Sequence, residues 1–212
     1  MIYIFERFDL PDYNYYDKMI PLLSTQRYAK VKRLRFDTGK KASICVYLLL
    51  RYALIRDYGI NEAVEFDFGA NEKPYLKNYP QVFFNLSHTQ NTAACVISDT
   101  ETGIDVQKIK AVSKKVAKRV LTQEEYSAFE NSEAPDDYFC EIWTVKESFL
   151  KKTGAGITKE LRDFSACSVT EKFTIKSEDY YCTVCGVEKQ VNYVGRDDFE
   201  RIFTGQTGQG AI

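Results

Sequence analysis

The chain has 212 residues, of which 44% are hydrophobic and 28% are charged, and its formal net charge is −1. This composition predicts one large or two small globular domains and excludes a disordered or fibrous protein. No apolar run approaches the ~20 residues that a membrane span needs, and charge follows the N-terminus too soon for a signal peptide. We therefore expect a cytoplasmic monomer that binds no membrane and, at this charge, no nucleic acid.

The first hundred residues alternate between strand and helix patterns. Ser24 or Thr25 can cap the first helix, whose run of Lys and Arg side chains is usually a solvated face. Gly59 is suited to end the second helix, which is apolar enough to lie in the core. In chain order we expect a strand over 1–5, a loop over 9–16, helices over 24–36 and 40–58, strands over 64–68 and 82–86, and a turn over 71–74.

Three polar residues end the predicted strand over 82–86. Asn85, Ser87 and His88 combine short polar side chains with an imidazole, and this combination suits the binding of an anion. His88 is the only histidine of the chain. A lone histidine is more often a surface residue or a satisfied core residue than a catalytic one, so the strand end alone does not decide its role.

The next two strands, over 93–98 and 103–107, predict a hairpin around residues 99–102. In the second strand Ile104 and Val106 face one way, while Asp105 and Gln107 face the other. Two oxygen-bearing side chains on one strand face can both reach a hard cation. The alternative is that this face meets only water.

The second half of the chain predicts helices and then short strands. Thr122 and Glu125 have the spacing of a capping box. The expected elements are helices over 113–121 and 135–153, with another helix starting at 122, strands over 164–169, 173–177, 181–185 and 191–194, and a loose tail over 205–212. The six cysteines lie in apolar segments, so we expect reduced, buried thiols; Cys182 and Cys185 have redox or zinc spacing, but no second pair completes a site.

The helix over 135–153 carries the most distinctive pattern. Trp143, Glu147 and Lys151 recur every four residues and therefore share one helix face. Gly154 should end this helix, because glycine adopts the left-handed conformation at little steric cost. Taken alone, Glu147 and Lys151 most often form an ordinary exposed pair worth a few tenths of a kcal/mol.

Three segments together resemble the 4′-phosphopantetheinyl transferase superfamily, in its longer single-chain type. They are Phe-Asn-Leu-Ser-His at 84–88, Gly-Ile-Asp-Val-Gln at 103–107, and Trp-Thr-Val-Lys-Glu-Ser-Phe-Leu-Lys at 143–151 with Gly-Ala-Gly at 154–156. Each motif alone is short, but their order and separation are specific. The resemblance extends roughly over residues 20–170.

The resemblance implies an activity, a fold and a partner. The family moves the phosphopantetheine arm of coenzyme A onto a serine of an apo acyl or peptidyl carrier protein, releases 3′,5′-ADP and needs Mg²⁺. Its fold is α/β (α+β), a pseudo-twofold pair of similar halves with the active site in the cleft between them. This implies halves over 1–102 and 103–204, followed by the tail over 205–212.

The resemblance also implies roles for individual residues. Asp105 and Glu147 would bind the magnesium against the pyrophosphate, and Glu147 could act as general base toward the carrier serine. Lys151 would contact the phosphate and assist the departing ADP. The coenzyme A phosphates would be bound by Arg27, Lys30, Ser43, Ser87 and His88, and the adenine would lie along Lys73 and Pro74.

One residue departs from the family pattern. The usual third acidic ligand is Gln107 here, which can still bind magnesium through its carbonyl or through a water. We therefore expect weaker metal binding in an active enzyme; the alternatives are a coenzyme A-binding protein without catalysis and a structural domain. We expect the carrier protein to contact the basic helix over 113–121, which carries Lys114, Lys115, Lys118 and Arg119.

Overall fold

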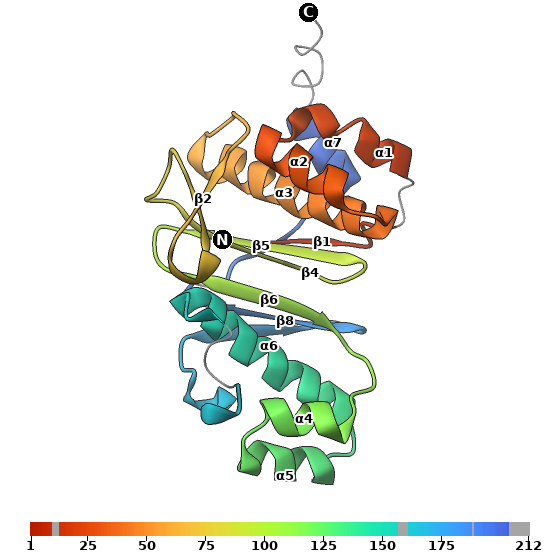
Figure 1. The fold of residues 1–212 in the computed structure, drawn as a ribbon, viewed down its shortest axis with the longest axis vertical. Helices are drawn as coiled ribbons and strands as arrows, with labels where there is room; N and C mark the ends of the chain where they lie inside the picture. The colour runs from red at the N-terminus through yellow and green to blue at the C-terminus, as the bar shows by residue number, and fades with distance from the viewer. Residues whose placement is uncertain (10–12, 157–160, 188, 204–212) are drawn as a thin grey trace, which may run out of the picture.

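Two mixed α/β layers face each other through their sheets in the computed structural model, which describes residues 1–9, 13–156, 161–187 and 189–203. In Figure 1 the first layer lies above and the second below. The strands are β1 (Ile2–Glu6), β2 (Phe66–Phe68), β3 (Pro74–Leu76), β4 (Phe83–His88), β5 (Thr92–Ser98), β6 (Gly103–Lys108), β7 (Lys172–Lys176), β8 (Tyr180–Cys185) and β9 (Val191–Tyr193).

The helices mostly follow the expected periodicity and caps. They are α1 (Tyr13–Asp17), α2 (Thr25–Arg33), α3 (Asp37–Tyr58), α4 (Lys114–Val120), α5 (Gln123–Asn131), α6 (Pro135–Thr153) and α7 (Arg196–Phe203), with short 3-10 turns at Ile20–Leu22, Ala70–Glu72, Leu161–Asp163 and Ala166–Ser168. Ser24 caps α2, and Thr122 and Glu125 form the predicted capping box of α5. Gly59 and Gly154 end α3 and α6 in the left-handed conformation, as predicted. None of the described helices has the length and hydropathy needed to cross a membrane.

The first layer consists of a four-stranded sheet, in the order β4-β5-β1-β9, and the helix α3 that packs against it. The second layer consists of the sheet β6-β8-β7 and the helix α6 that packs against it. Apolar side chains from both sheets, among them Ile2, Val96, Ile104 and Val184, form a core between the layers. As predicted, Ile104 and Val106 share this buried side of β6, which leaves Asp105 and Gln107 on the side of α6.

The predicted hairpin of β5 and β6 is wrong. β5 already has β4 on one edge and β1 on the other, so neither of its edges is free. β6 pairs instead with β8 in the second sheet. The short connection between β5 and β6 therefore crosses from one layer to the other.

Three further differences lie in short elements. The predicted strand over 164–169 is wrong, because the Ser165 hydroxyl accepts from the backbone nitrogen of Cys167 (3.2 Å) and favours a 3-10 turn. Residues 13–17, expected in a loop, form α1, and α7 was not predicted. At the end of the described chain, β9 pairs in parallel with β1 in the first sheet, and Phe199 of α7 packs against Phe5. Residues 204–212, which include the predicted loose tail, lie outside the described residues.

Candidate active site

Asp105 lies in a small polar network where β4, β6 and α6 meet. Its Oδ1 atom lies 2.6 Å from Lys151 Nζ and accepts a hydrogen bond from the Ser87 hydroxyl (2.9 Å). Lys151 also donates to the backbone oxygen of Ile104 (3.2 Å). The side chain of Asp105 is buried, and its second oxygen, Oδ2, has no hydrogen-bond partner within the described part of the chain. A buried carboxylate oxygen without a partner is costly, so it marks a place where a ligand can bind.

Gly103 allows α6 to approach β6 closely enough to form this network. A Cβ atom at Gly103 would overlap the backbone oxygen of Ser148 and the backbone nitrogen of Lys152, and it would lie 2.9 Å from the Cα atom of Lys152. Only glycine fits where strand backbone meets helix backbone at this distance. The first residue of the Gly-Ile-Asp segment therefore places Asp105 beside Lys151.

Glu147 faces the same network from α6. Burial raises the pKa of its carboxyl, and so does the negative charge of Asp105, while Lys151 lowers it. Among the described residues no ion pair joins Glu147 to Lys151, because the lysine pairs with Asp105 instead. The exposed pair that helix spacing alone predicts is therefore not formed. A carboxylate whose charge is disfavoured by burial and by a neighbouring carboxylate is an environment that a cation would stabilise.

The third predicted ligand, Gln107, also lies on β6, opposite Tyr181 of β8 and half-buried. Its backbone oxygen accepts from the Cys140 thiol (3.3 Å). No cluster of three His, Cys, Asp or Glu side chains suitable for a metal occurs in the part of the chain that the structure describes. Gln107 carries an amide and is not one of these four residue types.

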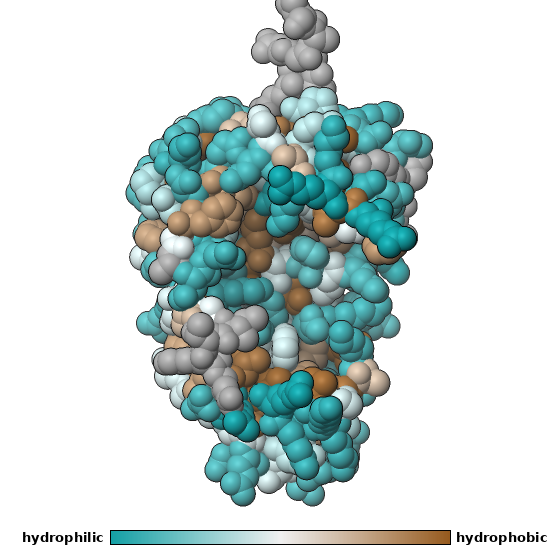
Figure 2. All heavy atoms as spheres, viewed as in Figure 1, coloured by the Kyte–Doolittle hydropathy of each residue, from teal (hydrophilic) through white to brown (hydrophobic). Residues whose placement is uncertain are grey.

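A basic pocket of about 430 Å³ lies between α2, α3, the β2–β3 hairpin and the end of β4. Its lining includes Arg27, Lys30, Ser43, Pro74 and His88. This volume is in the range that small-molecule sites occupy. Five of the predicted coenzyme-binding residues, from four elements, are thus brought to one pocket. Figure 2 shows hydrophobic side chains recessed between the two layers on the face that carries α2, α3 and α6.

Arg27 forms the base of this pocket and is only 7% exposed. Its guanidinium lies 5.1 Å from the ring centre of Tyr47 and 5.3 Å from that of Phe66, and it donates to the Ser43 hydroxyl (3.4 Å). No carboxylate pairs with it among the described residues, and burial lowers its pKa. Burial, followed by the charge of Arg27, also lowers the pKa of Lys30. A buried cation without a counter-ion, such as Arg27, favours an anionic ligand.

His88 stands at the rim of the pocket and is exposed on its outer side. Its Nδ1 atom lies 3.2 Å from the backbone oxygen of Thr89. The partial burial of the ring lowers the pKa of His88, and the charges of Lys151, Lys30 and Arg27 lower it further. His88 thus lines the basic pocket, while the residue before it on β4, Ser87, belongs to the Asp105 network.

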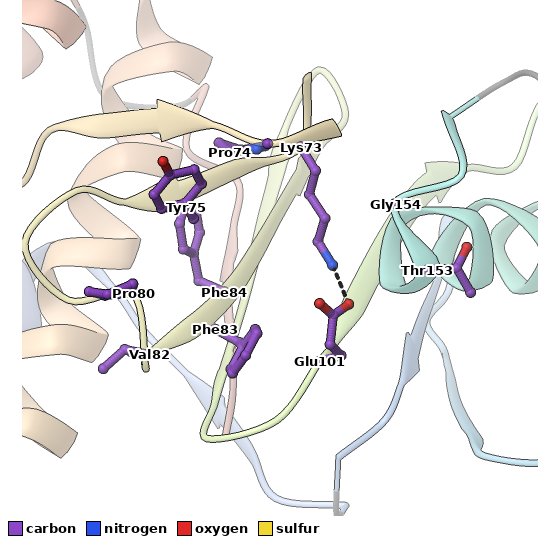
Figure 3. Close-up of a pocket in the computed structure, with 11 residues that line it drawn as sticks. Lys73, Pro74, Tyr75, Pro80, Val82, Phe83, Phe84, Glu101, Thr153 and Gly154 are labelled. Carbon is purple, nitrogen blue, oxygen red and sulfur yellow. Dashed lines mark hydrogen bonds and ion pairs between the residues drawn. The ribbon is translucent and has the colours of Figure 1, made fainter. Parts of the chain in front are cut away.

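Lys73 lies apart from the basic pocket. Figure 3 shows its side chain reaching from the hairpin to Glu101, with Thr153 and Gly154 of the α6 end beside it. Its Nζ atom lies 2.9 Å from Glu101 Oε2 and 2.6 Å from the backbone oxygen of Lys152. A second pocket of about 250 Å³ lies here, and Pro74 lines both pockets. Lys73 and Pro74 thus both line the second pocket, and of the two only Pro74 also lines the basic pocket.

Asn85 and Ser87 have a role that the sequence analysis missed. Both are buried, and they accept hydrogen bonds from the backbone nitrogens of Ile104 (3.0 Å) and Val106 (3.2 Å). These side chains connect β4 to β6 where the two strands belong to different sheets. The signal was present in the sequence, since two polar residues alternate with apolar ones along the strand.

Lys146 is another residue whose role the sequence analysis missed. Its side chain is fully buried, lies 2.6 Å from Glu125 Oε2, and donates to the backbone oxygens of Val120 (2.8 Å) and Leu161 (2.9 Å). Burial lowers the pKa of Lys146, while Glu125 raises it. Such a buried, fully bonded ammonium fixes α6 against α4 and α5. The sequence offered only its position next to Glu147.

Comparison with known proteins gives one consistent family. The sequence model of the 4′-phosphopantetheinyl transferase superfamily matches residues 101–194. A 4′-phosphopantetheinyl transferase of Bacillus subtilis is 32% identical over 154 residues, which cover 70% of this chain and 68% of the relative. The 4′-phosphopantetheinyl transferase Sfp of Bacillus subtilis strain 168 is 28% identical over 70% of this chain and 68% of its own length.

A relative from another organism is also similar to this chain. The 4′-phosphopantetheinyl transferase HetI of a Nostoc species is 32% identical over 146 residues, which cover 65% of this chain and 62% of the relative. The matched segment of the family model includes Asp105, Glu147 and Lys151, the three residues around which the polar network is built. The chain belongs to the 4′-phosphopantetheinyl transferase superfamily.

Proposed function

We propose that this enzyme transfers the 4′-phosphopantetheine group of coenzyme A to a serine hydroxyl of an apo carrier protein, at the Asp105, Glu147 and Lys151 network. The relatives are named as transferases, and these comparisons give no support to a binding protein without catalysis. The observation that carries the proposal is the buried, unpartnered Oδ2 atom of Asp105, which lies beside an ammonium and a second carboxylate.

The basic pocket would bind the coenzyme A phosphates. Arg27 and Lys30 supply positive charge, Ser43 supplies a hydroxyl, and His88 connects the pocket to the network. Lys151 lies next, with its ammonium able to contact the pyrophosphate once it leaves Asp105. A phosphoryl transfer depends mainly on positioning and charge neutralisation, and these residues supply both.

Asp105 and Glu147 would hold Mg²⁺, with Gln107 as a neutral third ligand. The donor set fits, since hard oxygen ligands suit this ion and Asp105 has an oxygen to spare. The ion would supply charge neutralisation at the pyrophosphate when bound. Glu147 would accept the serine proton as the serine oxygen forms its bond to phosphorus. The bond from that phosphorus to 3′,5′-ADP breaks, and Lys151 stabilises the charge on the leaving group.

The carrier protein would contact α4. Lys114 pairs with Glu130 (3.0 Å), and Lys118 lies over the ring of Tyr126 (5.2 Å). Lys115 and Arg119 are exposed one helical turn apart, and Val116 between them is 42% exposed. A basic face with an apolar centre suits an acidic amphipathic surface.

Three broader expectations belong to the same proposal. A pseudo-twofold relation of two halves, divided near Thr102, is supported by three antiparallel strands against one long helix in each layer. β9 crosses this division, because it joins the first sheet. A cytoplasmic setting is supported by six free cysteines, five of them buried. The monomeric state stays a prediction.

Intact-mass measurement tests the proposed function. The protein is incubated with coenzyme A, Mg²⁺ and each of several apo carrier proteins, and one phosphopantetheine mass should appear on a carrier. Calorimetric titration with coenzyme A runs beside it. Binding without transfer to any carrier would contradict catalysis, and the absence of both would contradict the proposed function altogether.

A further inference from the structure

The tip of the β2–β3 hairpin joins the first layer to the C-terminal end of α6. The Asn71 side-chain amide donates to the backbone oxygen of Gly154 (2.8 Å), across 83 residues of sequence. Lys73 Nζ donates to the backbone oxygen of Lys152 (2.6 Å). These carbonyls lie at the helix end, where backbone oxygens lack partners within the helix. Two side chains of the hairpin tip therefore bond the end of the helix that carries Glu147 and Lys151.

The two glycines of the Gly-Ala-Gly segment receive this tip. A Cβ atom at Gly154 would lie 3.3 Å from Lys73 Cδ, and one at Gly156 would lie 3.3 Å from Asn71 Cβ. Both glycines have a positive φ, 64° and 66°, which other residues adopt only with strain. The segment thus ends α6 and also leaves room for Asn71 and Lys73.

The hairpin tip is itself in an unusual conformation. Asn71 and Glu72 are consecutive non-glycine residues with positive φ, 53° and 60°. Asparagine tolerates this region better than most residues, but a pair of such residues persists only where the surroundings fix it. The bonds to the end of α6 fix it together with two backbone bonds of the hairpin, from Gly69 N to Lys73 O (3.0 Å) and from Glu72 N to Gly69 O (3.2 Å).

The same hairpin forms a wall of the basic pocket. Phe66, Phe68 and Pro74 line that pocket, and Pro74 also lines the second pocket with Thr153 and Gly154. Figure 3 shows Pro74 and Lys73 on the hairpin with Gly154 on the opposite side. One short element therefore contacts both the coenzyme-binding pocket and the end of the catalytic helix.

We propose that Asn71 is a positioning residue that fastens the hairpin to Gly154 and so sets the wall of the coenzyme A pocket relative to Glu147 and Lys151. This inference rests on the proposed function. In this proposal the Gly-Ala-Gly segment ends the helix and also makes room for the hairpin tip. Asn71 itself is neither one of the hydrogen-bonded residues of the Asp105 network nor one of the residues that line the basic pocket.

The test replaces Asn71 by aspartate. Asn71→Asp keeps size and tolerance of positive φ, but it removes the donated hydrogen bond and sets a carboxylate against a carbonyl. The dissociation constant for coenzyme A in calorimetry and the KM for coenzyme A should both rise, by about tenfold for a lost hydrogen bond with an unpaired acceptor. The kcat at saturating coenzyme A and the Tm should change little. Asn78→Asp is the control, since Asn78 is exposed on the loop after β3.

A cross-link separates positioning from a general loss of stability. Asn71→Cys with Gly156→Cys would bring two Cβ atoms to about 3.3 Å, close to the range that disulfides need. The control is Gly156→Cys alone, which has the same strain at positive φ without the cross-link, and the exposed Cys167 is replaced by serine in both proteins. The oxidised protein should bind coenzyme A as tightly as the wild type, and reduction should weaken binding as in Asn71→Asp.

The outcomes are distinct from those of the proposed function. If the wild type binds no coenzyme A and transfers nothing, the proposed function itself fails. If the wild type binds and Asn71→Asp binds equally well, the positioning role is wrong. It is also wrong if oxidation of the cross-linked protein leaves its affinity for coenzyme A as low as in the reduced form.

Discussion

Glu147 and Lys151 are neighbours on one face of α6, yet no ion pair joins them among the described residues. Lys151 forms an ion pair with Asp105 of β6, while burial, followed by the charge of Asp105, raises the pKa of Glu147. The helix spacing identifies which residues share a face, but it cannot identify the strand that the face meets. That partner follows only from the packing of α6 on β6 at Gly103. The site therefore depends on one close contact between a helix and a strand.

Replacement of Glu147 separates the catalytic from the structural interpretation. Glu147→Gln removes the charge that a ligand and general base needs, so turnover should fall by about 100-fold or more. The Tm of the metal-free protein at pH 7 should stay equal or rise, because burial and Asp105 already disfavour the ionised form. Glu141→Gln, on the exposed face of the same helix, is the control. Full turnover in Glu147→Gln would leave this residue with no catalytic role.

His88 should make stability depend on pH. Its pKa in the folded protein is lowered from about 6.5, so the unfolded chain takes up a proton at higher pH than the folded one. The free energy of unfolding should therefore fall as the pH drops below about 6.5. His88→Gln removes this contribution, and its stability should fall less between pH 7 and pH 5.5. If urea unfolding gave the same change in the free energy of unfolding with pH for both proteins, the fold would not lower the pKa of His88.

The elements themselves follow largely from sequence. The glycines that end helices correctly predicted where α3 and α6 end, because such signals act within a few residues. The β5–β6 hairpin was predicted wrongly, since strand pairing depends on partners far away in the chain. Helix α7 was missed, although Phe199 and Phe203 are four residues apart and buried on one face. The sequence therefore predicts most of the individual elements but not how the strands pair within the two layers.

Substitution of Gly103 tests whether the site depends on the close contact of β6 with α6. Gly103→Ala would place a methyl group against the backbone of Ser148 and Lys152, which no rotamer can relieve. We expect a loss of about 3 kcal/mol in unfolding free energy, the upper end of overpacking costs, and loss of transfer. Gly39→Ala is the control for stability, because its Cβ would lie 3.9 Å from the nearest side-chain atom. A stable, active Gly103→Ala protein would contradict this account of the site.

The two layers supply different parts of the proposed site. The first layer contributes the basic pocket and the hairpin, and the second contributes Asp105, Glu147 and Lys151. The sequence motifs predicted most of these residues but not their division. Lys73, which the resemblance places with Pro74 along the adenine, lines the second pocket with Pro74 and also bonds Glu101 and the end of α6. A lysine chain is long enough to serve either place, so sequence position alone could not decide between them.

If the basic residues of α4 contact the carrier protein, the rate of transfer should depend on salt concentration. Reversal of charge at Lys115 and Arg119 to glutamate should slow transfer about tenfold or more at low salt and flatten the dependence of its rate on ionic strength. Reversal at Lys18 and Lys77, which are exposed in the first layer, makes the same change in net charge and should have little effect. Unchanged kinetics in the α4 variant would remove this helix from the interface.

The most direct test of the central claim is the rate of phosphopantetheine transfer measured against Mg²⁺ concentration in three proteins. The wild type should be active, because Asp105 and Glu147 together with the coenzyme A pyrophosphate can bind the ion. Gln107→Glu adds a charge near the cation, so it should reach half-maximal rate at lower Mg²⁺ with little change in maximal rate. Asp105→Asn should lose most activity at every concentration. A wild type that is silent at every Mg²⁺ concentration and is restored by Gln107→Glu would contradict the account.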